Sequence, residues 1–437
     1  MMPTGDKRKH VVIIGGGFGG IAAAKKLKNQ QNIDVTLIDR SNHHLFQPLL
    51  YQVATAALSP GDIATPIREL FKDTRNVRVL MAEAEQVQPD RQVIVLGDGR
   101  EVGYDRLILA PGARYNYFGN RDWERHAPGL KSIADALDIR ERILLSLEEA
   151  EQIEDPKLRE PYLTYVIIGG GPTGVEMAGA IAEIAKRQMI RNYRNISANE
   201  VRVFLVEAAS GILQGYSSDL SEKARLMLEN MGVRVLLNTP VTSIRKERVQ
   251  FKSGTIQTPN IIWAAGVAAS PLVNSLGAEQ DRSGRVRVEP DLSVPGRPEV
   301  YVIGDAAVVS DENGDPLPAV APVALQQGAY VADRVLNGRM GEEVPAFRYK
   351  DKGSMATIGR AKAVAQIKGL KLSGFTAWFL WSFVHILFLM QFHNKVRVFV
   401  EWIWYYFTFQ RGVRLITDRM ESKRPVRPQK EESDECR

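Results

Sequence analysis

Cysteine is almost absent from this chain of 437 residues, which has only Cys436, in its charged C-terminal segment. A single cysteine cannot form a disulfide within the chain, and it excludes a metal site built from cysteines. It also excludes reductases that work through a pair of redox-active cysteines. We therefore expect neither a metal site nor dithiol chemistry.

A large excess of charge of one sign is also missing. The formal net charge is +6, and the hydrophobic and charged fractions, 44% and 25%, are ordinary for a globular protein. Basic residues are dense from Lys350 onward, beside an apolar segment. This placement favours an anionic lipid surface over nucleic acid as a partner.

The N-terminus lacks the apolar stretch of a targeting sequence. MMPTGDKRKH runs directly into the first apolar segment. We therefore expect neither a signal peptide nor a transit peptide, and a catalytic body that stays in the cytoplasm.

Alternating strand and helix patterns predict an α/β protein. Apolar runs at 11–14 and 34–39 flank an Ala-rich helix, which is the order of a right-handed parallel unit. A second such unit begins at Leu163, after a charged helix at 132–154 and the helix-breaking segment DPKLREP. The sequence thus predicts two Rossmann-like dinucleotide-binding domains.

Each unit carries a glycine loop between its first strand and its helix. The first loop contains Gly15, Gly17, Phe18, Gly19 and Gly20, and the second contains Gly169, Gly171, Pro172, Thr173 and Gly174. In such loops the first glycine permits a tight turn, the second admits a pyrophosphate, and the third lets helix and strand pack closely. The helix N-terminus then offers N–H groups to the phosphates. A plain turn explains a single match, but two complete matches favour dinucleotide binding.

An acid ends the strand that follows each loop. Asp39 lies 19 residues beyond Gly20, and Glu207 lies 33 residues beyond Gly174, which places an insertion near RNYRNISANE. Such a carboxylate accepts hydrogen bonds from ribose hydroxyls, and Glu207 would repel a 2′-phosphate, favouring NADH over NADPH. A solvated surface acid is the alternative for Glu207. Two dinucleotides in one chain usually pass a hydride between a nicotinamide and a flavin.

The segment after Gly369 is unusually aromatic. Fourteen of the 34 aromatic residues, and four of the six tryptophans, lie within 374–411. Ser373–Phe392 has no formal charge and is long enough to cross a bilayer as a helix, whereas the next segment carries Arg397 and Glu401. We favour monotopic membrane attachment, with a single span through 373–392 or a buried dimer core as alternatives. The tryptophans expected at the membrane interface are Trp378, Trp381, Trp402 and Trp404.

These motifs together resemble those of the type II NADH:quinone oxidoreductases, single-subunit flavoproteins that do not pump protons. The resemblance runs from about Lys9 to Thr417. HHLFQPLLYQVA follows the first acid, as in many bacterial members, YDRLILAPGA and NIIWAAGV resemble two strand-end motifs, and VYVIGDAA matches the flavin motif. APVALQQG resembles the quinone segment AQxAxQ, and SGFTAW…FQRGVRLI resembles the membrane-anchoring C-terminus.

The resemblance implies a domain order and a location. It implies a FAD-binding domain in two parts, 9–160 and 271–350, with a NADH-binding domain, 161–270, inserted between them. A helical membrane-anchoring region follows at 351–419, and we expect a disordered tail at 420–437. The implied location is the cytoplasmic side of the cell inner membrane, with NADH, a membrane quinone and the lipid bilayer as partners. The oligomeric state stays open, with a homodimer as one candidate.

The resemblance also implies site residues. Besides the first loop and Asp39, it assigns to FAD the residues Arg40, Gln47, Pro48, Gly112, Gly304 and Asp305. It adds Gly266 to the NADH site formed by the second loop and Glu207. It assigns Ala324, Gln326 and Gln327 to the quinone, whereas Pro322 replaces the first glutamine of the quinone pattern.

Three polar residues are candidates for catalysis. Glu176 would tune the flavin or relay protons, with a structural acid at the helix start as the alternative. Gln326 would present an amide to a quinone carbonyl, although glutamine on a helix is often simply solvated. His385 lies within the apolar run and would hydrogen-bond the quinone or supply a proton, with an interfacial histidine as the alternative.

Three other classes share part of this pattern. A soluble NADH-dependent reductase of ferredoxin or rubredoxin has both loops, but it leaves the aromatic C-terminus unexplained. Sulfide:quinone oxidoreductases require the redox cysteines that this chain lacks. A non-enzymatic NADH-binding flavoprotein, of the apoptosis-inducing-factor type, would fail to oxidise NADH steadily with a soluble quinone.

Overall fold

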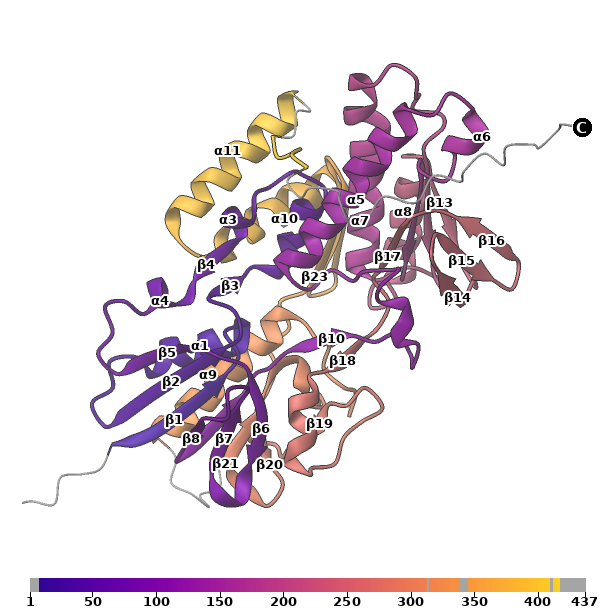
Figure 1. The fold of residues 1–437 in the computed structure, drawn as a ribbon. Helices are drawn as coiled ribbons and strands as arrows, with labels where there is room; N and C mark the ends of the chain where they lie inside the picture. The colour runs from indigo at the N-terminus through magenta and orange to yellow at the C-terminus, as the bar shows by residue number, and fades with distance from the viewer. Residues whose placement is uncertain (1–7, 313, 338–344, 409–411, 417–437) are drawn as a thin grey trace, which may run out of the picture.

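Two α/β bodies make up most of the molecule. A computed structural model describes residues 8–312, 314–337, 345–408 and 412–416. Each body is built around a parallel sheet, and the C-terminal helices α10 and α11 lie beside the upper body in Figure 1. The expected α/β class is confirmed, whereas the proposed tail at 420–437 lies outside the described residues.

The lower body contains a six-stranded sheet in the order β20-β21-β9-β1-β2-β5. Five strands are parallel, and β20 pairs antiparallel at the edge. The strands are β1 (Lys9–Ile14), β2 (Ile33–Asp39), β5 (Val77–Met81), β9 (Arg106–Leu109), β20 (Ser293–Val294) and β21 (Arg297–Val302). The chain therefore leaves this sheet after β9 and returns to it about 180 residues later, at β20. The last four residues of β1, 11–14, are apolar and buried, as expected of a parallel strand whose sheet is covered on both faces.

The upper body contains a four-stranded parallel sheet in the order β13-β12-β11-β17. Its strands are β11 (Thr164–Ile168), β12 (Arg202–Val206), β13 (Val233–Leu236) and β17 (Asn260–Trp263). Its helices are α5 (Ile133–Glu151), α7 (Pro172–Glu183) and α8 (Ser218–Glu229). α5 begins at a capping box, in which Ser132 and Asp135 bind each other's backbone N–H groups.

Smaller sheets complete the two bodies. A three-stranded antiparallel sheet, β14 (Val241–Arg245), β15 (Arg248–Phe251) and β16 (Gly254–Gln257), belongs to the upper body, and another, β6 (Ala84–Gln88), β7 (Val93–Leu96) and β8 (Glu101–Gly103), belongs to the lower. A tight turn at Asp98-Gly99 joins β7 and β8. A two-stranded ribbon, β10 (Ala113–Tyr115) with β18 (Val267–Ala269), connects the bodies in Figure 1.

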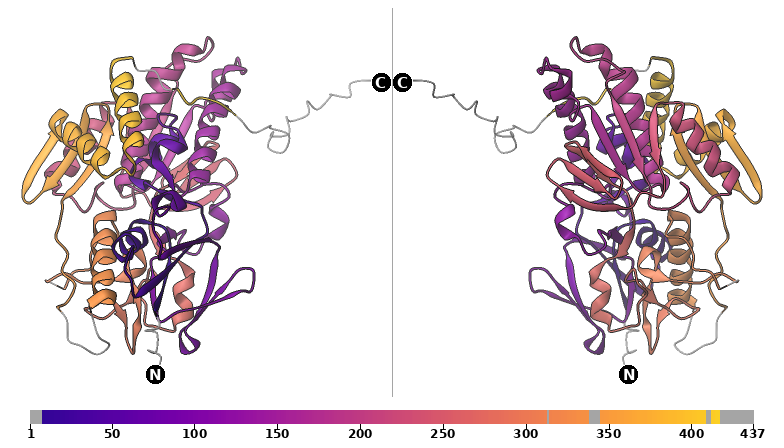
Figure 2. Two further views of the ribbon diagram at one scale, coloured as in Figure 1. Left: turned by 90° about the vertical axis from the view of Figure 1, so that its left-hand side faces the viewer. Right: turned by 90° about the vertical axis from the view of Figure 1, so that its right-hand side faces the viewer.

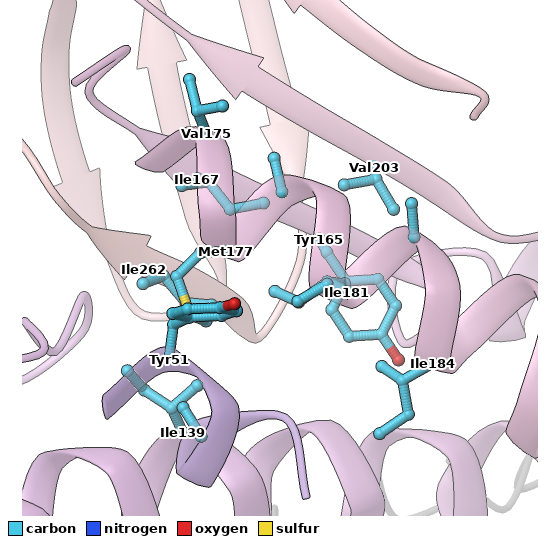
Figure 3. Packing of buried hydrophobic residues seen from close by; sticks show 14 of the residues in the cluster. Tyr51, Ile139, Tyr165, Ile167, Val175, Met177, Ile181, Ile184, Val203 and Ile262 are labelled. Carbon is cyan, nitrogen blue, oxygen red and sulfur yellow. The ribbon is translucent and has the colours of Figure 1, made fainter. Parts of the chain in front are cut away.

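The largest apolar core lies in the upper body. It includes side chains of α2 (Leu50–Ala54), α5, α7 and the four-stranded sheet. Figure 3 shows Tyr51 beneath Met177, with Ile139 of α5 below it. Tyr51 lies on α2, which follows a strand of the lower body. This core therefore joins the chain of the lower body to α7, the helix that follows the second glycine loop.

The sequence predicted a helical C-terminal region, but the structure shows that this region begins with a sheet. β23 (Ser354–Gly359), β24 (Lys362–Ile367) and β25 (Leu370–Gly374) form an antiparallel sheet that packs on α7 and α8. Figure 2 shows this sheet and the two following helices on one flank of the molecule.

The alternative of a single spanning helix through 373–392 is ruled out. The segment forms α10 (Phe375–Phe388), ends in extended backbone at Leu389, turns at Gln391 with φ of 63°, and continues as α11 (Phe392–Thr408). Among the described residues, no helix combines the length and the apolar character that crossing a bilayer requires. The composition of this segment indicates that it is apolar, but composition alone does not reveal that the helix is interrupted between α10 and α11.

The contact between α7 and β23 gives a direct test of this packing. A Cβ atom on Gly179 would lie 1.7 Å from the Ile358 carbonyl oxygen. We predict that Gly179→Ala lowers the free energy of unfolding by roughly 1–3 kcal/mol, because helix and strand must separate. Urea denaturation measures this change. Gly61→Ala, with no atom within 4 Å of the added carbon, is the control, and equal effects of the two variants would contradict the packing.

Candidate functional site

The first glycine loop lies between the C-terminal end of β1 and α1 (Phe18–Leu27). Gly15 has φ of +103°, and a Cβ atom on it would lie 2.1 Å from the Ala110 oxygen. A Cβ on Gly20 would lie 1.8 Å from the Gly15 oxygen, whereas around Gly17 no atom lies within 4 Å. The first and third glycines are thus required by the chain's own packing, and the second faces open space.

Two side chains hold the peptide of Gly16 in this loop. Asp39 accepts hydrogen bonds from the N–H of Gly16 and of Ser41, each at 2.6 Å. His44, which is 1% exposed, lies 2.8 Å through Nδ1 from the Gly16 oxygen and must donate there. Asp39 was predicted from the sequence, whereas His44 was not, since the motif HHLFQPLLYQVA gives no reason to single it out.

The second loop repeats this geometry. Gly169 has φ of +111°, a Cβ on Gly174 would lie 1.8 Å from the Gly169 oxygen, and Gly171 again faces open space. Glu207 accepts hydrogen bonds from the N–H of Gly170 at 2.6 Å and of Ala209 at 2.8 Å. Glu207 is therefore fixed at the loop and is not a freely solvated acid.

Both helices that follow the loops begin without a side-chain cap. The N-caps are Gly17 for α1 and Gly171 for α7, and neither glycine has a side chain to bind the first N–H groups. Pro172 occupies the first turn of α7, where a missing N–H is tolerated. Uncapped N–H groups beside an open glycine match the requirements of a pyrophosphate.

The segment around Asp305 forms a fixed turn near the first loop. Gly304, with φ of 68°, and Asp305 lie in the 3₁₀ turn η7 (Gly304–Ala306), and Gln327 accepts a 2.6 Å hydrogen bond from the N–H of Gly304. Within the described part of the chain, no hydrogen bond or ion pair reaches the Asp305 carboxylate. A partly exposed, unpaired carboxylate beside an open glycine loop fits a ribityl hydroxyl, so the residues present fit FAD.

The remaining residues expected near FAD follow strands of the same sheet or the strand that carries His44. Arg40 is exposed at the end of β2, and Gly112, with φ of 69°, follows β9. Gln47 and Pro48 form η1 (Gln47–Leu49), directly after β3 (His43–Leu45). The C-terminal ends of parallel strands share one edge, which is where ligands of open α/β sheets bind.

The glutamines of the quinone pattern both bind the backbone. They lie on α9 (Ala321–Asn337), with Pro322 in its first turn and Ala324 buried. Gln326 donates to the Lys350 oxygen and accepts from the Lys350 N–H, each at 3.0 Å. Gln327, 1% exposed, supports Gly304. Both amides therefore have structural partners, and their contact with a quinone stays a prediction.

Glu176 lies on α7, five residues beyond Gly171, and is only partly exposed. Burial raises the pKa of its carboxyl to about 8, although the N–H of Thr357 on β23, 3.5 Å from Oε1, favours the ionised form. Tyr216 is close enough for the Glu176 charge to add to the rise that burial causes in its own pKa. Glu176 therefore holds a proton at neutral pH. Thr357 and Tyr216 had no signal in the sequence.

A series of ring contacts leads from the first loop to the C-terminal helices. Phe18 meets Phe46 at 5.9 Å between centroids, Phe46 meets His385 at 6.2 Å, and His385 stacks on Trp381 at 4.2 Å. Trp381 stacks in turn on Trp402 at 5.3 Å. Trp381 is only 2% exposed, so its expected place at the membrane interface is wrong. Its ring is enclosed by these neighbours.

The tautomer of His385 follows from its hydrogen bond. Nδ1 lies 2.7 Å from the Trp381 carbonyl oxygen, which can only accept, so Nδ1 carries the proton. Burial lowers the pKa of His385 to about 4. At neutral pH the ring is therefore uncharged, and Nε2 can accept a hydrogen bond but has no proton to supply.

The outer surfaces of α10 and α11 form one apolar face. On α10 the exposed residues are spaced about four apart, and on α11 they follow a similar helical period. The members of this outer face are Phe375, Phe379, Phe383, Leu387 and Phe388 of α10, and Phe392, Val396, Phe399, Val400, Ile403, Trp404 and Phe407 of α11. Each of these large apolar side chains is between 43% and 81% exposed, and such a gathering on two helices is typical of an interaction surface.

Inner contacts hold the two helices to the body. Trp402 Nε1 donates to Gln52 at 2.8 Å, Tyr405 donates to Glu183 at 2.9 Å, and Arg397 lies 3.5 Å from the buried Asp62. Arg397 therefore lies on the side of α11 that meets α3 (Pro60–Ile63). The outer face is thus presented by helices that the rest of the protein holds in place.

The raised pKa of Glu176 has a consequence for stability. In the unfolded chain this carboxyl has its ordinary pKa of about 4.5, so between pH 4.5 and about 8 the folded state binds more protons. Stability gained from protonated Glu176 is present below about pH 4.5 and is lost as pH rises to about 8. The glutamine of the variant Glu176→Gln cannot ionise, so the variant avoids this loss. We predict that the free energy of unfolding of Glu176→Gln minus that of wild type, measured with urea, is larger at pH 8 than at pH 5. A difference independent of pH, or larger at pH 5, would show that Glu176 is not held protonated.

Comparison with known proteins places the chain in a family. A family model of pyridine nucleotide-disulphide oxidoreductases matches residues 9–328, and a model of the NDH2 C-terminal domain matches residues 352–411. The type II NADH:quinone oxidoreductase Ndh of Mycobacterium tuberculosis is 43% identical over 428 residues, covering 94% of this chain and 91% of the relative. NdhA of the same organism is also 43% identical, with coverage of 94% and 90%.

The fold agrees with a solved structure. NDH2 of Plasmodium falciparum in complex with NADH has a TM-score of 0.84 over 93% of this chain and 100% of that chain, at 23% identity. At this identity the likeness concerns the fold alone. With the family models and the two mycobacterial relatives, it leads to one conclusion: the chain belongs to the pyridine nucleotide-disulphide oxidoreductases and, within them, to the type II NADH:quinone oxidoreductases.

Proposed function

We propose that the first glycine loop holds FAD, that the second holds NADH, and that α10 and α11 attach the protein monotopically to the membrane that contains its quinone. As a type II NADH:quinone oxidoreductase, the protein oxidises NADH through FAD and reduces a membrane quinone, without pumping protons. In balance, NADH, one proton and a quinone give NAD⁺ and a quinol. The observation that carries the assignment of sites is the same loop-and-acid geometry, built twice in one chain.

The lower body supplies the FAD site. The α1 N-terminus and Gly17 would receive the pyrophosphate, with Phe18 and Gly19 beginning the helix. Asp39 would keep the loop in shape while meeting the ribose, and Asp305 would bind the ribityl chain. Arg40, Gln47, Pro48, Gly112 and Gly304 border this space. When bound, FAD supplies the redox chemistry that no side chain can provide, by taking a hydride and passing on two electrons.

The upper body supplies the NADH site. Gly171, Thr173 and the α7 N-terminus would bind the pyrophosphate, and Gly266 would border the site at the end of β17. Glu207 would meet the adenosine ribose while holding Gly170. Glu176, on the same helix, would face the reacting rings as a neutral acid that can hold or release a proton.

The quinone would approach from the C-terminal helices. Ala324 and Gln327 of α9 border the turn that carries Asp305. We propose that Gln326 reaches the quinone by giving up a Lys350 contact. His385 would accept a hydrogen bond from the quinol hydroxyl through Nε2. Because Gln327 is committed to Gly304, its part is to fix the turn.

The outer apolar face supports monotopic attachment. Burying apolar surface contributes about 25 cal/mol per Å², and a single phenylalanine about 1.5–3 kcal/mol. Lys395 of the same region suits an anionic headgroup. We place the body on the cytoplasmic side, where NADH is available. A homodimer stays a prediction.

The nicotinamide preference tests the NADH site. Glu207→Gln keeps one acceptor for the loop but removes the charge. We predict that the ratio of kcat/KM for NADPH to that for NADH rises by roughly tenfold, since like-charge repulsion near a surface costs on the order of 1–4 kcal/mol. Steady-state kinetics with both cofactors measure it. Glu229→Gln, at an exposed acid of α8, should leave the ratio unchanged, and a Glu207→Gln enzyme with the wild-type ratio would remove Glu207 from the NADH site.

The anchor is tested by charging its outer face. Phe379→Asp with Phe399→Asp should release the protein from vesicles, because losing two buried rings costs about 3 kcal/mol or more, over a hundredfold in partitioning. The variant should still reduce ferricyanide with NADH and lose activity with long-tailed quinone. The control pair, Leu158→Asp with Leu226→Asp, changes exposed leucines of α6 (Pro156–Arg159) and α8, outside this face. If the charged variant cosediments with vesicles as wild type does, the anchor is misassigned.

A further inference from the structure

Gln52 is a buried polar residue that the reaction, as described so far, does not use. It lies on α2, shortly after Gln47 and Pro48, and is only 8% exposed. Its amide has a partner at each atom, since Nε2 donates to the Tyr51 hydroxyl and Oε1 accepts from Trp402 Nε1, both at 2.8 Å. A buried amide is costly unless its groups are bonded, so these two bonds account for its place.

Tyr51 gives this amide a fixed base. Its ring is 7% exposed and lies in the core of the upper body, beneath Met177 in Figure 3. α2, which carries both Tyr51 and Gln52, also packs on α5 and α7. The amide that holds Trp402 of α11 is therefore itself held by the core.

Trp402 supports a stack of rings on α10. It stacks on Trp381 at 5.3 Å between centroids, and Trp381 stacks on His385 at 4.2 Å, each pair with an interplanar angle of 28°. Among the described residues, none accepts a hydrogen bond from Trp381 Nε1, so packing alone orients that ring. Within this stack, Trp402 is the ring that a hydrogen bond ties to the α/β bodies.

The orientation of His385 has two determinants. The bond from Nδ1 to the Trp381 carbonyl oxygen stays within α10 and sets the tautomer. The stack on the Trp381 ring sets the plane of the imidazole. The lone pair of Nε2 lies in that plane, so the plane decides which donor Nε2 can meet.

The chemistry of the quinone decides when Nε2 is useful. Reduction adds two electrons and two protons to a quinone, and both of its carbonyl oxygens become hydroxyl groups. A carbonyl oxygen accepts hydrogen bonds and cannot pair with Nε2, which also accepts. A new hydroxyl can donate to Nε2, so this bond forms only as the quinol forms. Such an interaction speeds the step without tightening the binding of quinone.

We propose that Gln52 is a positioning residue for quinol formation. Through the two stacked tryptophans it holds the His385 ring in the plane where Nε2 meets the new hydroxyl. This inference rests on the proposed role of His385 and deepens it. Tyr405 of α11 bonds Glu183 independently of Gln52, so loss of the Gln52 bond leaves α11 attached to the body.

The test isolates the quinone step in the FAD-loaded enzyme on vesicles. Enzyme reduced with NADH is mixed anaerobically with increasing long-tailed quinone, and stopped-flow absorbance gives the limiting rate of flavin reoxidation and the half-saturating quinone concentration. Gln52→Met should lower the limiting rate roughly tenfold, the effect of losing one hydrogen bond of ordinary strength. The half-saturating concentration, the ferricyanide rate and vesicle binding should stay unchanged, because the loss falls on the step alone.

Two further variants are the controls. Gln52→Glu keeps an acceptor for Trp402 and should stay near the wild-type limiting rate. Gln152→Met removes a glutamine hydrogen bond that stays within the end of α5, and it should change none of these quantities.

Trp402→Phe breaks the same bond from the other side. It should lower the limiting rate as Gln52→Met does, and the double variant should be no slower than the slower single variant, because both changes remove one interaction. If Gln52→Met does not fold, Trp402→Phe takes its place in the test.

The outcomes separate this proposal from the function on which it rests. His385→Phe keeps a ring for the stack but removes Nε2, and it should also be slow. A slow His385→Phe with a wild-type limiting rate in Gln52→Met would overturn the positioning role alone. A Gln52→Met enzyme that changes only the half-saturating concentration would overturn it too, since Gln52 would then be merely structural. A wild-type limiting rate in His385→Phe would instead overturn the proposed function of His385.

Discussion

Both proposed dinucleotide sites depend on a close approach inside the glycine loop, between the third glycine and the carbonyl oxygen of the first. A side chain on Gly20 or on Gly174 would begin 1.8 Å from that oxygen. This contact seats the helix directly on its strand, with its N-terminus at the sheet edge. With the helix seated in this way, the open second glycine and the uncapped N–H groups lie at the sheet edge. The acid at the end of the next strand lies at the same edge. The anion-binding character of both loops is thus a product of backbone packing.

The two acids have a double role that links packing to recognition. Asp39 and Glu207 each use both carboxylate oxygens to hold backbone N–H groups. A carboxylate oxygen has more than one lone pair, so it can hold the loop and still meet a ribose hydroxyl. Loop shape and ligand selection therefore depend on the same atoms. A change at either acid is expected to affect both.

Much of the site was predictable because its determinants are local. The glycine spacing, the strand before each loop and the acid after it lie within a few dozen residues, and the structure places them as expected. His44 was not predicted, since its neighbour Gly16 is brought to it only by tertiary folding. The same limit applies to Gln327, whose glutamine pattern was seen but whose bond to Gly304 was not. Trp381 was placed at the membrane because a helix that is apolar on all sides does not reveal its inner face.

The C-terminal region connects its apolar outer face to the two α/β bodies. Its sheet is packed on α7, its helices bind Gln52 and Glu183, and its rings continue to Phe18 at the first loop. The apolar outer face and the proposed flavin site are therefore parts of one connected structure. A soluble reductase of ferredoxin would gain nothing from such a face.

The central claim is that electrons pass from NADH to the bound flavin and then to a quinone in the membrane. Anaerobic stopped-flow absorbance of the protein on vesicles that contain a long-tailed quinone tests both steps in one experiment. NADH should bleach the flavin, and the flavin colour should return as quinol forms in equal amount. Bleaching without recovery, on vesicles to which the protein is bound, would contradict the account.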